Sequence, residues 1–365
     1  MPLTTVSPGM LDTTAQYYSF KNRIINGAMV IDQRNAGAAV TANGSFPVDR
    51  MRIFNSSDGA FSAQQDSSAP VGFTNSVKVT TTTADGTLTG SQNLQFTQRI
   101  EGTNVADLGW GTASAAPVTL SFWVRSSLTG TFGGSLRNSA GTRSYPYTYT
   151  ISVADTWEYK TVTIAGDTSG TWLTTTGIGL IVFFGLGVGP DVSGTAGAWA
   201  GANYLSATGA VSVIGTLNAT WYITGVQLEK GSTATSFDYR PYDAELALCQ
   251  RYFEKSYQQG TSIGSSGTGN TGQTLYIGTG NIVGSGDKLP NTTFMVTKRT
   301  APTVNTWSPN GTANTLANMA GTDLATNSCT PNVANDRSFF AYNATSSVTG
   351  SLGCVQFQWS ASAEL

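Results

Sequence analysis

At 365 residues the chain is long enough for two domains, and its 42 glycines and 11% charged residues, against about a quarter in an ordinary globular protein, favour short strands joined by turns. Its 19 basic and 21 acidic residues leave a net charge of −2, which excludes the electrostatic footprint of a nucleic-acid or membrane-surface binder. The sequence contains no histidine, so Ser-His and Cys-His nucleophile systems are excluded, whereas glycosidases that use two carboxylates are not.

The first predicted element is an extended N-terminal arm, residues 1–24. The segment contains Pro2 and Pro8 and shows little apolar periodicity, so it favours neither a helix nor a strand. It also lacks the basic start and the apolar stretch of a secretory signal. Because such segments become ordered only when they dock, we expect this arm to attach the chain to another protein.

Residues 25–240 predict an antiparallel β-sandwich of jelly-roll type. Residues 119–125 alternate apolar and polar side chains, as a half-buried strand does. Residues 178–188 form the most apolar run, which falls short of the ~20 residues that span a bilayer and therefore predicts a buried strand. The remaining predicted strands are residues 77–82, 93–100, 157–164, 211–216 and 220–228. Stretches rich in glycine, serine and asparagine separate the strands, as in sandwiches with long loops.

Residues 241–256 predict one short connecting helix. Asp243 stands at the N-cap position of the pattern, and Leu246, Cys249 and Phe253 follow at spacings of three and four residues. These three side chains form one apolar stripe. The stripe fits the core face of a packing helix, and a contact between subunits is the alternative.

Residues 257–365 predict a smaller C-terminal β domain. A segment rich in glycine, serine and threonine opens it, and the predicted strands are residues 274–283, 292–298, 338–343 and 354–360. Four aromatic residues lie among its Asn-, Thr- and Gly-rich loops, a mixture that offers rigid aromatic contacts and adaptable hydrogen bonds: Tyr276, Trp307, Phe339 and Tyr342. They are the predicted receptor- or glycan-binding residues, and filling a small core is the alternative for each of them.

Aromatic residues also gather in the predicted sandwich. Tyr145, Tyr147 and Tyr149 alternate along one segment. Others stand in glycine-rich loops, namely Trp110, Trp172, Trp199 and Tyr204. Exposed rings stack on sugars, yet aromatic residues in sandwiches mostly fill cores and subunit contacts. A structural role is therefore favoured, with sugar binding as the alternative.

No motif predicts catalysis, a cofactor or a metal. Residues 267–272 match the G-x-G-x-x-G pattern, but a strand follows where a phosphate-binding turn needs a helix. Carboxylates close in sequence, such as Asp155 with Glu158, are typical of turns and caps. The three cysteines match no metal or redox spacing, and reduced buried thiols are favoured over one disulfide: Cys249, Cys329 and Cys354. We therefore expect neither an enzyme nor a bound cofactor.

Several stretches, taken together, resemble bacteriophage tail-fibre and related virion proteins. Residues 17–37, which begin Tyr-Tyr-Ser-Phe-Lys-Asn-Arg-Ile-Ile-Asn-Gly, resemble the start of many such proteins. Residues 221–241, which begin Trp-Tyr-Ile-Thr-Gly-Val-Gln-Leu-Glu-Lys-Gly, resemble the end of their jelly-roll domain. Residues 245–253, with Cys-Gln-Arg-Tyr, look like the helix that follows it, and the final Ser-Ala-Ser-Ala-Glu-Leu is similar to how these proteins close.

The family's jelly roll is similar in turn to carbohydrate-binding modules. Those often open with Asn-Gly-x-Phe-Glu and close on a strand whose acidic residues hold a structural calcium. Here Asn26 and Gly27 are kept, but Val30 stands in place of the glutamate, and Thr224 and Gly225 occupy the closing acidic positions. We therefore predict no metal.

The resemblance implies a phage tail-fibre-type structural protein that mediates attachment to the host cell surface. It would be a homotrimer on the virion, made in the host cytoplasm. Residues 1–24 would contact other virion proteins, such as a tail adaptor, nozzle or portal-proximal protein, and residues 257–365 would face a host surface glycan or outer-membrane protein. We expect no nucleic-acid partner and no insertion into a membrane.

Two alternatives to this role stay open. A head fibre, capsid decoration or tail adaptor protein would use the same jelly roll mainly for protein contacts. A polysaccharide depolymerase would instead need an elongated repeat fold and a groove of paired carboxylates, neither of which the sequence predicts.

Overall fold

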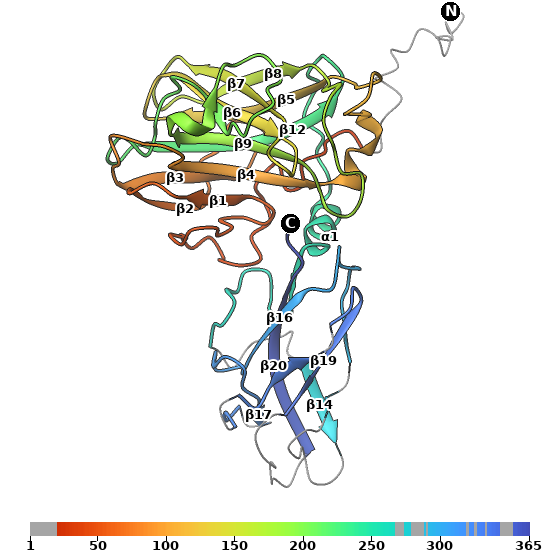
Figure 1. Ribbon diagram of the computed structural model, residues 1–365. Coiled ribbons are helices and arrows are strands. Elements are labelled where there is room, and N and C mark those ends of the chain that lie inside the picture. Colours follow the sequence, from red (N-terminus) through yellow and green to blue (C-terminus); the bar gives the residue numbers. More distant parts are fainter. Residues whose placement is uncertain are drawn as a thin grey trace, which may run out of the picture. The chain divides into compact units, whose positions relative to one another are not determined.

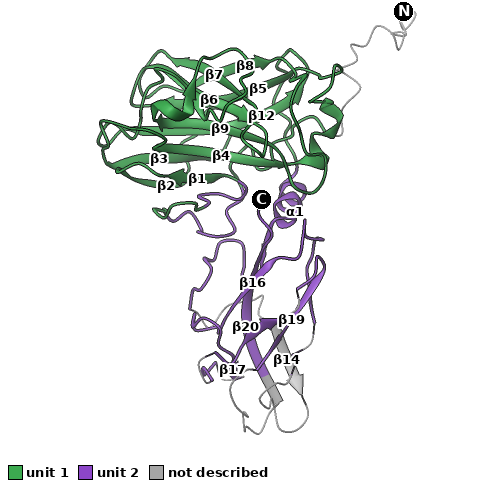
Figure 2. Ribbon diagram, viewed as in Figure 1, with its two compact units in different colours: residues 1–30, 39–45, 51–240 green, residues 31–38, 46–50, 241–365 purple. Residues whose placement is uncertain are grey.

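The computed structural model describes residues 20–266, 274–278, 288–289, 291–318, 321–324, 327–332, 334–343 and 353–365. These residues form two compact units, coloured separately in Figure 2. Of the described residues, those within 20–30, 39–45 and 51–240 form the first unit, and those within 31–38, 46–50 and 241–365 form the second. The predicted all-β sandwich is confirmed (Figure 1). Most of the predicted arm lies outside the described residues, as do residues 267–272.

The first unit is a sandwich of two five-stranded antiparallel sheets (Figure 1). The first sheet has the strand order β1 (Arg52–Asn55), β4 (Asn93–Glu101), β9 (Ile178–Val188), β6 (Gly130–Arg137), β7 (Ser144–Ile151). The second sheet has the order β2 (Ala60–Asp66), β3 (Ser76–Thr83), β12 (Thr220–Lys230), β5 (Val118–Ser126), β8 (Glu158–Ile164). The chain crosses repeatedly from one sheet to the other, so neighbours within a sheet are seldom neighbours in sequence.

Aromatic side chains fill the space between the two sheets. Trp221 on β12 is fully buried, and its ring lies 5.7 Å from Phe96 and 5.8 Å from Phe184 of the opposite sheet. Tyr149 is also buried, and its hydroxyl accepts a hydrogen bond of 3.2 Å from the Trp221 indole. Burial raises the pKa of Tyr149 well above its ordinary value. Tyr147 is equally enclosed, so for these tyrosines the structural interpretation is confirmed.

Most of the predicted strands of the sandwich are confirmed, but residues 211–216 are not a strand. Val213 and Ile214 are fully buried, which explains their apolar character. The backbone around them turns instead, because the amide of Thr216 donates to the carbonyl of Val213 at 3.2 Å. The amide of Gly215 donates to the Ser212 hydroxyl at 3.1 Å. Two buried side chains therefore anchor a loop, and the amide of Ile214 fastens it to β9 by donating to the carbonyl of Leu186 at 2.9 Å.

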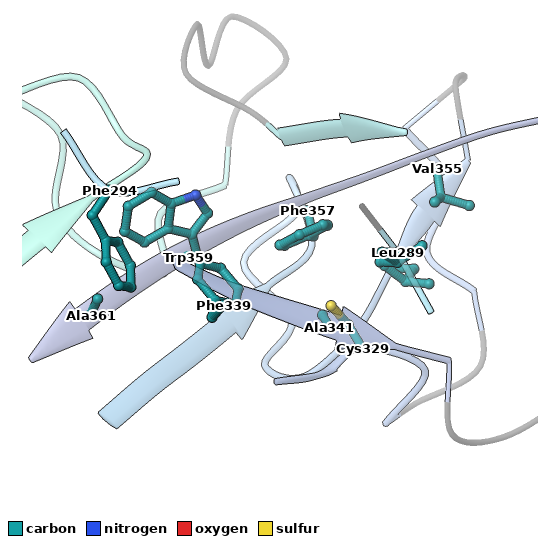
Figure 3. Packing of buried hydrophobic residues seen from close by; sticks show 10 residues of the cluster. Leu289, Phe294, Cys329, Phe339, Ala341, Val355, Phe357, Trp359 and Ala361 are labelled. Carbon is teal, nitrogen blue, oxygen red and sulfur yellow. The ribbon is translucent and has the colours of Figure 1, made fainter. Parts of the chain in front are cut away.

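Strand β20 (Gly353–Ser362) organises the second unit. It pairs with β13 (Phe253–Lys255), β14 (Thr274–Gly278), β16 (Thr303–Trp307) and β17 (Ala317–Asn318). A three-stranded sheet of β15 (Thr292–Thr293), β19 (Ser338–Tyr342) and β18 (Thr330–Asn332) completes the unit. The core lies along β20, where the rings of Phe294, Phe339 and Trp359 pack within 6 Å of one another (Figure 3).

The predicted helix is present as α1 (Tyr242–Gln250) and is shorter than the sequence pattern suggests. Pro241 occupies the N-cap in place of Asp243, and Phe253 lies beyond the helix, in β13. Cys249 and Phe253 are buried inside the second unit, which corrects their assignment to a subunit contact, because a buried side chain has no surface for a partner. Leu246 is half-buried, and its role stays a prediction.

Residues 31–38 and 46–50 belong to the second unit, although the sequence places them inside the sandwich domain. Buried charged side chains hold these two segments. Arg34 contacts Asp49 at 3.0 Å and Glu364 at 2.9 Å, and Arg50 also pairs with Glu364. The Arg50 guanidinium lies 3.5 Å from the centre of the Tyr252 ring. Ion pairs between distant parts of the sequence thus decide which unit these segments join.

None of the helices in the described ranges is both long and apolar enough to cross a membrane. Across those same ranges, no three metal-ligating side chains gather into a cluster. Cys249 and Cys329 are free and buried, as the sequence favoured. Burial raises the pKa of the Cys329 thiol to about 12.

Candidate functional site

The outer face of the first sheet carries a groove of about 430 Å³, over strands β1, β4, β9 and β6. Hydrogen-bonding side chains line much of it: Arg52, Ser56, Ser91, Asn93, Gln95, Thr97, Arg99, Arg137 and Asn203. Apolar side chains complete it: Phe54, Ile181, Phe183, Val192 and Leu205. Grooves that combine polar groups with apolar surface are the usual form of small-molecule and saccharide sites.

The strand register places two arginines of the groove in one row. Arg99 on β4 and Arg137 on β6 both pair with Ile181 on β9, which lies between them. Residues directly opposite in antiparallel strands point to the same face of the sheet. The two guanidinium groups therefore flank one apolar side chain on the outer face.

A second row of the register brings the third arginine to the same face. Arg52 on β1 pairs with Thr97 on β4, and Thr97 pairs with Phe183 on β9. Along β4, side chains point alternately outward and inward, so Gln95, Thr97 and Arg99 face the groove while their neighbours fill the core. The groove floor is thus made of every second residue of these strands.

One wall of the groove is apolar and comes from the segment that follows β9. Val192 and Leu205 are buried against Ile181 and Phe183 in one cluster. They cover the outer face of β9, which explains why this strand is apolar on both faces. The guanidinium of Arg137 lies 4.9 Å from the centre of the Phe183 ring, so this wall also positions a charged group.

The charged side chains of the groove lining are all arginines. None of its lining residues, all of them among the described residues, carries a carboxylate. Burial lowers the pKa of Arg137 and the nearby charge of Arg99 lowers it further. Arg137 donates a hydrogen bond to the side-chain oxygen of Asn203, a neutral partner.

Three polar atoms of the lining are buried without a hydrogen-bond partner in the protein. They are Oδ1 of Asn93, Oε1 of Gln95 and Nε of Arg137. A buried polar atom left unsatisfied costs roughly 1–3 kcal/mol. The groove therefore retains hydrogen-bonding capacity that the protein itself does not use.

Of the four aromatic residues predicted to bind a receptor, the three whose side chains are described do not form one site in the second unit. Phe339 is 1% exposed and packs in the core, which corrects its assignment, because no surface of its ring reaches a ligand. Trp307 is half-buried on β16, and Tyr342 is half-buried on β19 in the other sheet. The side chain of Tyr276 lies outside the described residues.

Three loop tryptophans of the sandwich form a structural cluster. Trp110, Trp172 and Trp199 meet edge to face, with ring centres 4.7 to 5.4 Å apart. Each indole donates a hydrogen bond to a backbone carbonyl, and for Trp110 the acceptor is Ala116 at 2.7 Å. The bonds of Trp110 and Trp172 stay within their own loops, whereas Trp199 bonds to Ala165 in another segment. The ring contacts then hold these segments together, so the structural interpretation holds for this cluster as well.

The sequence-based prediction missed the three groove arginines. Each stands in a strand at an outward position, and charged residues make up only 11% of the chain. A basic residue next to an apolar strand residue was the available signal, such as Arg99 beside Ile100 and Arg137 beside Leu136. Its meaning depended on which strands become neighbours, and no local pattern gives that information.

No family model matches the sequence, and no curated protein sequence matches it significantly. Among solved structures, similar folds include the enzymatically active domain of tailspike protein 4 of bacteriophage CBA120, at 14% identity and a TM-score of 0.31. That similarity covers 57% of this chain and 21% of the tailspike chain.

Two further similar structures have comparable scores. A putative sugar binding protein from Bacteroides thetaiotaomicron has 14% identity, a TM-score of 0.31, and coverage of 57% of this chain and 100% of its own. A family 11 carbohydrate-binding module from Clostridium thermocellum has 12% identity, a TM-score of 0.27, and coverage of 54% and 98%.

Proposed function

We propose that the chain binds a carbohydrate in the groove of the first sheet. The observation that carries this proposal is the composition of the groove, which sets amide and guanidinium groups beside the half-buried ring of Phe54. Sugars present hydroxyl groups around their rims and apolar patches on their ring faces. Amides and arginines bond the hydroxyls, and aromatic rings pack on the apolar faces.

We infer further that this binding attaches a phage particle to the glycan surface of its host. The resemblance of residues 17–37 and 221–241 to tail-fibre proteins supports a place on the virion. The same resemblance supports a homotrimer, which a mass measurement of the whole chain in solution would test. A monodisperse monomer would contradict that part of the proposal.

The proposal places binding in the sandwich and not in residues 257–365. The groove gathers its polar groups on one face, whereas Trp307 and Tyr342 lie in different sheets of the second unit. The groove is therefore the first binding site to test, ahead of residues 257–365, which the sequence favoured.

We propose binding without cleavage. Hydrolysis of a glycosidic bond ordinarily needs two carboxyl groups on either side of it, and the groove lining has none among the described residues. Incubation of the chain with the polysaccharide that it binds should release no new reducing ends. A rise of reducing ends above an enzyme-free blank would establish a depolymerase instead.

Affinity electrophoresis in gels that contain host surface polysaccharide tests carbohydrate binding. We expect the full chain to be retarded, and Phe54→Ala to weaken retention by up to about tenfold through the loss of one ring contact. Tyr159→Ala is the matched control, because Tyr159 is 43% exposed on β8 of the second sheet. Equal migration of the wild-type chain with and without polysaccharide would contradict the proposal.

A further inference from the structure

We propose that the groove is selective for an acidic saccharide, whose anionic group lies against Arg99 and Arg137. This inference rests on the proposed carbohydrate binding and names the class of sugar. It depends on three features of the groove: the arginines that line it, the absence of acids from its lining, and the neutral hydrogen-bonding groups beside them.

Two of the groove arginines, Arg52 and Arg137, differ from other arginines of the same unit in their partners. Arg143 makes two hydrogen bonds of 2.7 and 2.6 Å to Asp167, and Arg23 pairs with Asp107 at 2.8 Å. In contrast, within the described part of the chain, neither Arg52 nor Arg137 forms an ion pair. Arg52 donates to the carbonyl of Gly44 and Arg137 donates to Asn203; both partners are neutral, so a bound anion can still neutralise these two charges.

The two arginines that pair with Ile181 also act on one another. Arg99 and Arg137 flank Ile181; burial lowers the pKa of Arg137 and the charge of Arg99 lowers it further, because like charges repel. A carboxylate between them would relieve this repulsion. Carboxylates bind guanidinium groups through paired, charge-assisted hydrogen bonds, which are about twice as strong as neutral ones.

The neutral part of the groove indicates a saccharide and not a small inorganic anion. Gln95 and Arg99 face the groove from positions four residues apart on β4, which is about 13 Å at roughly 3.3 Å per residue. That length exceeds a single sulfate or phosphate. Buried oxygens of Asn93 and Gln95 without protein partners are acceptors for hydroxyl groups, which an acidic glycan supplies beside its anionic group.

The test uses the full chain and a panel of acidic polysaccharides with different linkages: polygalacturonate, alginate, hyaluronate and polysialate. Each is paired with its carboxyl-reduced form, in which the acid is converted to a primary alcohol and the linkage is kept. Affinity is measured by titration calorimetry. We expect at least one acidic member to bind about tenfold or more tightly than its reduced partner, and its affinity to fall as salt is added.

Substitutions assign this selectivity to the groove. Arg99→Gln and Arg137→Gln should each lower affinity for the acidic member about tenfold and lower affinity for the reduced partner by a clearly smaller factor, since only the acidic member loses a charge-assisted bond. Arg125→Gln removes the same charge from β5 of the second sheet, outside the groove lining, and should change neither affinity.

Each outcome decides a different claim. Equal affinity for acidic and reduced members would overturn the inference while carbohydrate binding stands. Failure to bind any member in either form would overturn carbohydrate binding and the inference together. Loss of binding in Arg125→Gln as large as in Arg137→Gln would show a general charge effect and would also overturn the inference.

Discussion

Within the described ranges, two lysines, Lys255 and Lys298, are buried, although only 11% of the protein's residues are charged. Lys298 is 1% exposed and pairs with Glu254, which is 2% exposed. Its ammonium group also donates to the backbone carbonyls of Gln250 and Val296, at 2.6 and 2.9 Å. These three acceptors satisfy the three donors of a lysine, so the charge is tolerated in the interior.

Removal of one partner of this pair should destabilise the second unit strongly. We expect Lys298→Met to cost about 3–5 kcal/mol, because Glu254 would be left as an uncompensated buried charge. Lys160→Met is the control: it breaks the pair with Glu158 near the surface, and we expect a cost of about 0–1 kcal/mol. Urea unfolding followed by hydrogen exchange at β20 and β8 measures both, and equal costs would contradict the role given to burial.

Lys255 predicts a pH dependence of stability. It is 6% exposed, and burial lowers the pKa of its ammonium group from 10.5 to about 8. Between these two pH values the unfolded chain binds the proton and the folded chain does not, so the free energy of unfolding rises with pH, by about 3 kcal/mol in all. Below pH 8 both states are charged and this contribution is constant.

The measurement is urea unfolding of the wild-type chain and Lys255→Met over the same pH range. We expect the stability advantage of the methionine variant, which carries no charge at this site, to shrink steadily as the pH rises through this window. Parallel curves for the two proteins would show that the lysine keeps its ordinary pKa.

At the scale of elements, the opening segment of the first unit is joined to its last strand. The amide of Arg23 donates to the carbonyl of Leu228, and the amide of Val226 donates to the carbonyl of Gly27, each at 2.9 Å. Gly225 has a φ of 61° at an irregularity of β12, a conformation that favours glycine. Two stretches that the sequence singled out for their resemblance are therefore direct neighbours in the fold.

Gly27 offers a test of this contact. A Cβ atom at this position would overlap the carbonyl oxygen of Val226, so Gly27→Ala must push the segment away from β12. We expect a loss of about 1–3 kcal/mol in the free energy of unfolding. Gly86→Ala is the control, since nothing lies near the added atom there. A Gly27→Ala protein as stable as the Gly86→Ala protein would show that the contact is dispensable.

At the scale of the whole molecule, the location of receptor binding can be decided by competition. Excess full-length chain, added to host cells before the phage that carries it, should reduce adsorption. We expect Arg137→Gln to lose this effect, because it removes a charge from the groove, and Trp307→Ala to keep it. The reverse result would return the receptor site to residues 257–365.

The amino-acid sequence by itself determined the fold class, most strands of the sandwich and the position of the helix. These features follow from local patterns, such as the alternation of apolar and polar residues in β5 and the apolar run of β9. Such patterns can be read without knowing which strands become neighbours. The absence of histidine likewise needed no structure, because composition alone excludes the chemistry that histidine provides.

Only the tertiary structure decided which residues form the groove. Arg99 and Arg137 are 38 positions apart in the sequence, and both reach the same row because β9 inserts between their strands. Phe339 and Trp307 show the converse, since similar local sequence settings leave one ring buried and the other half-exposed. Strand order and register set the face and the neighbours of every side chain, and they depend on pairings between distant segments that local periodicity does not encode.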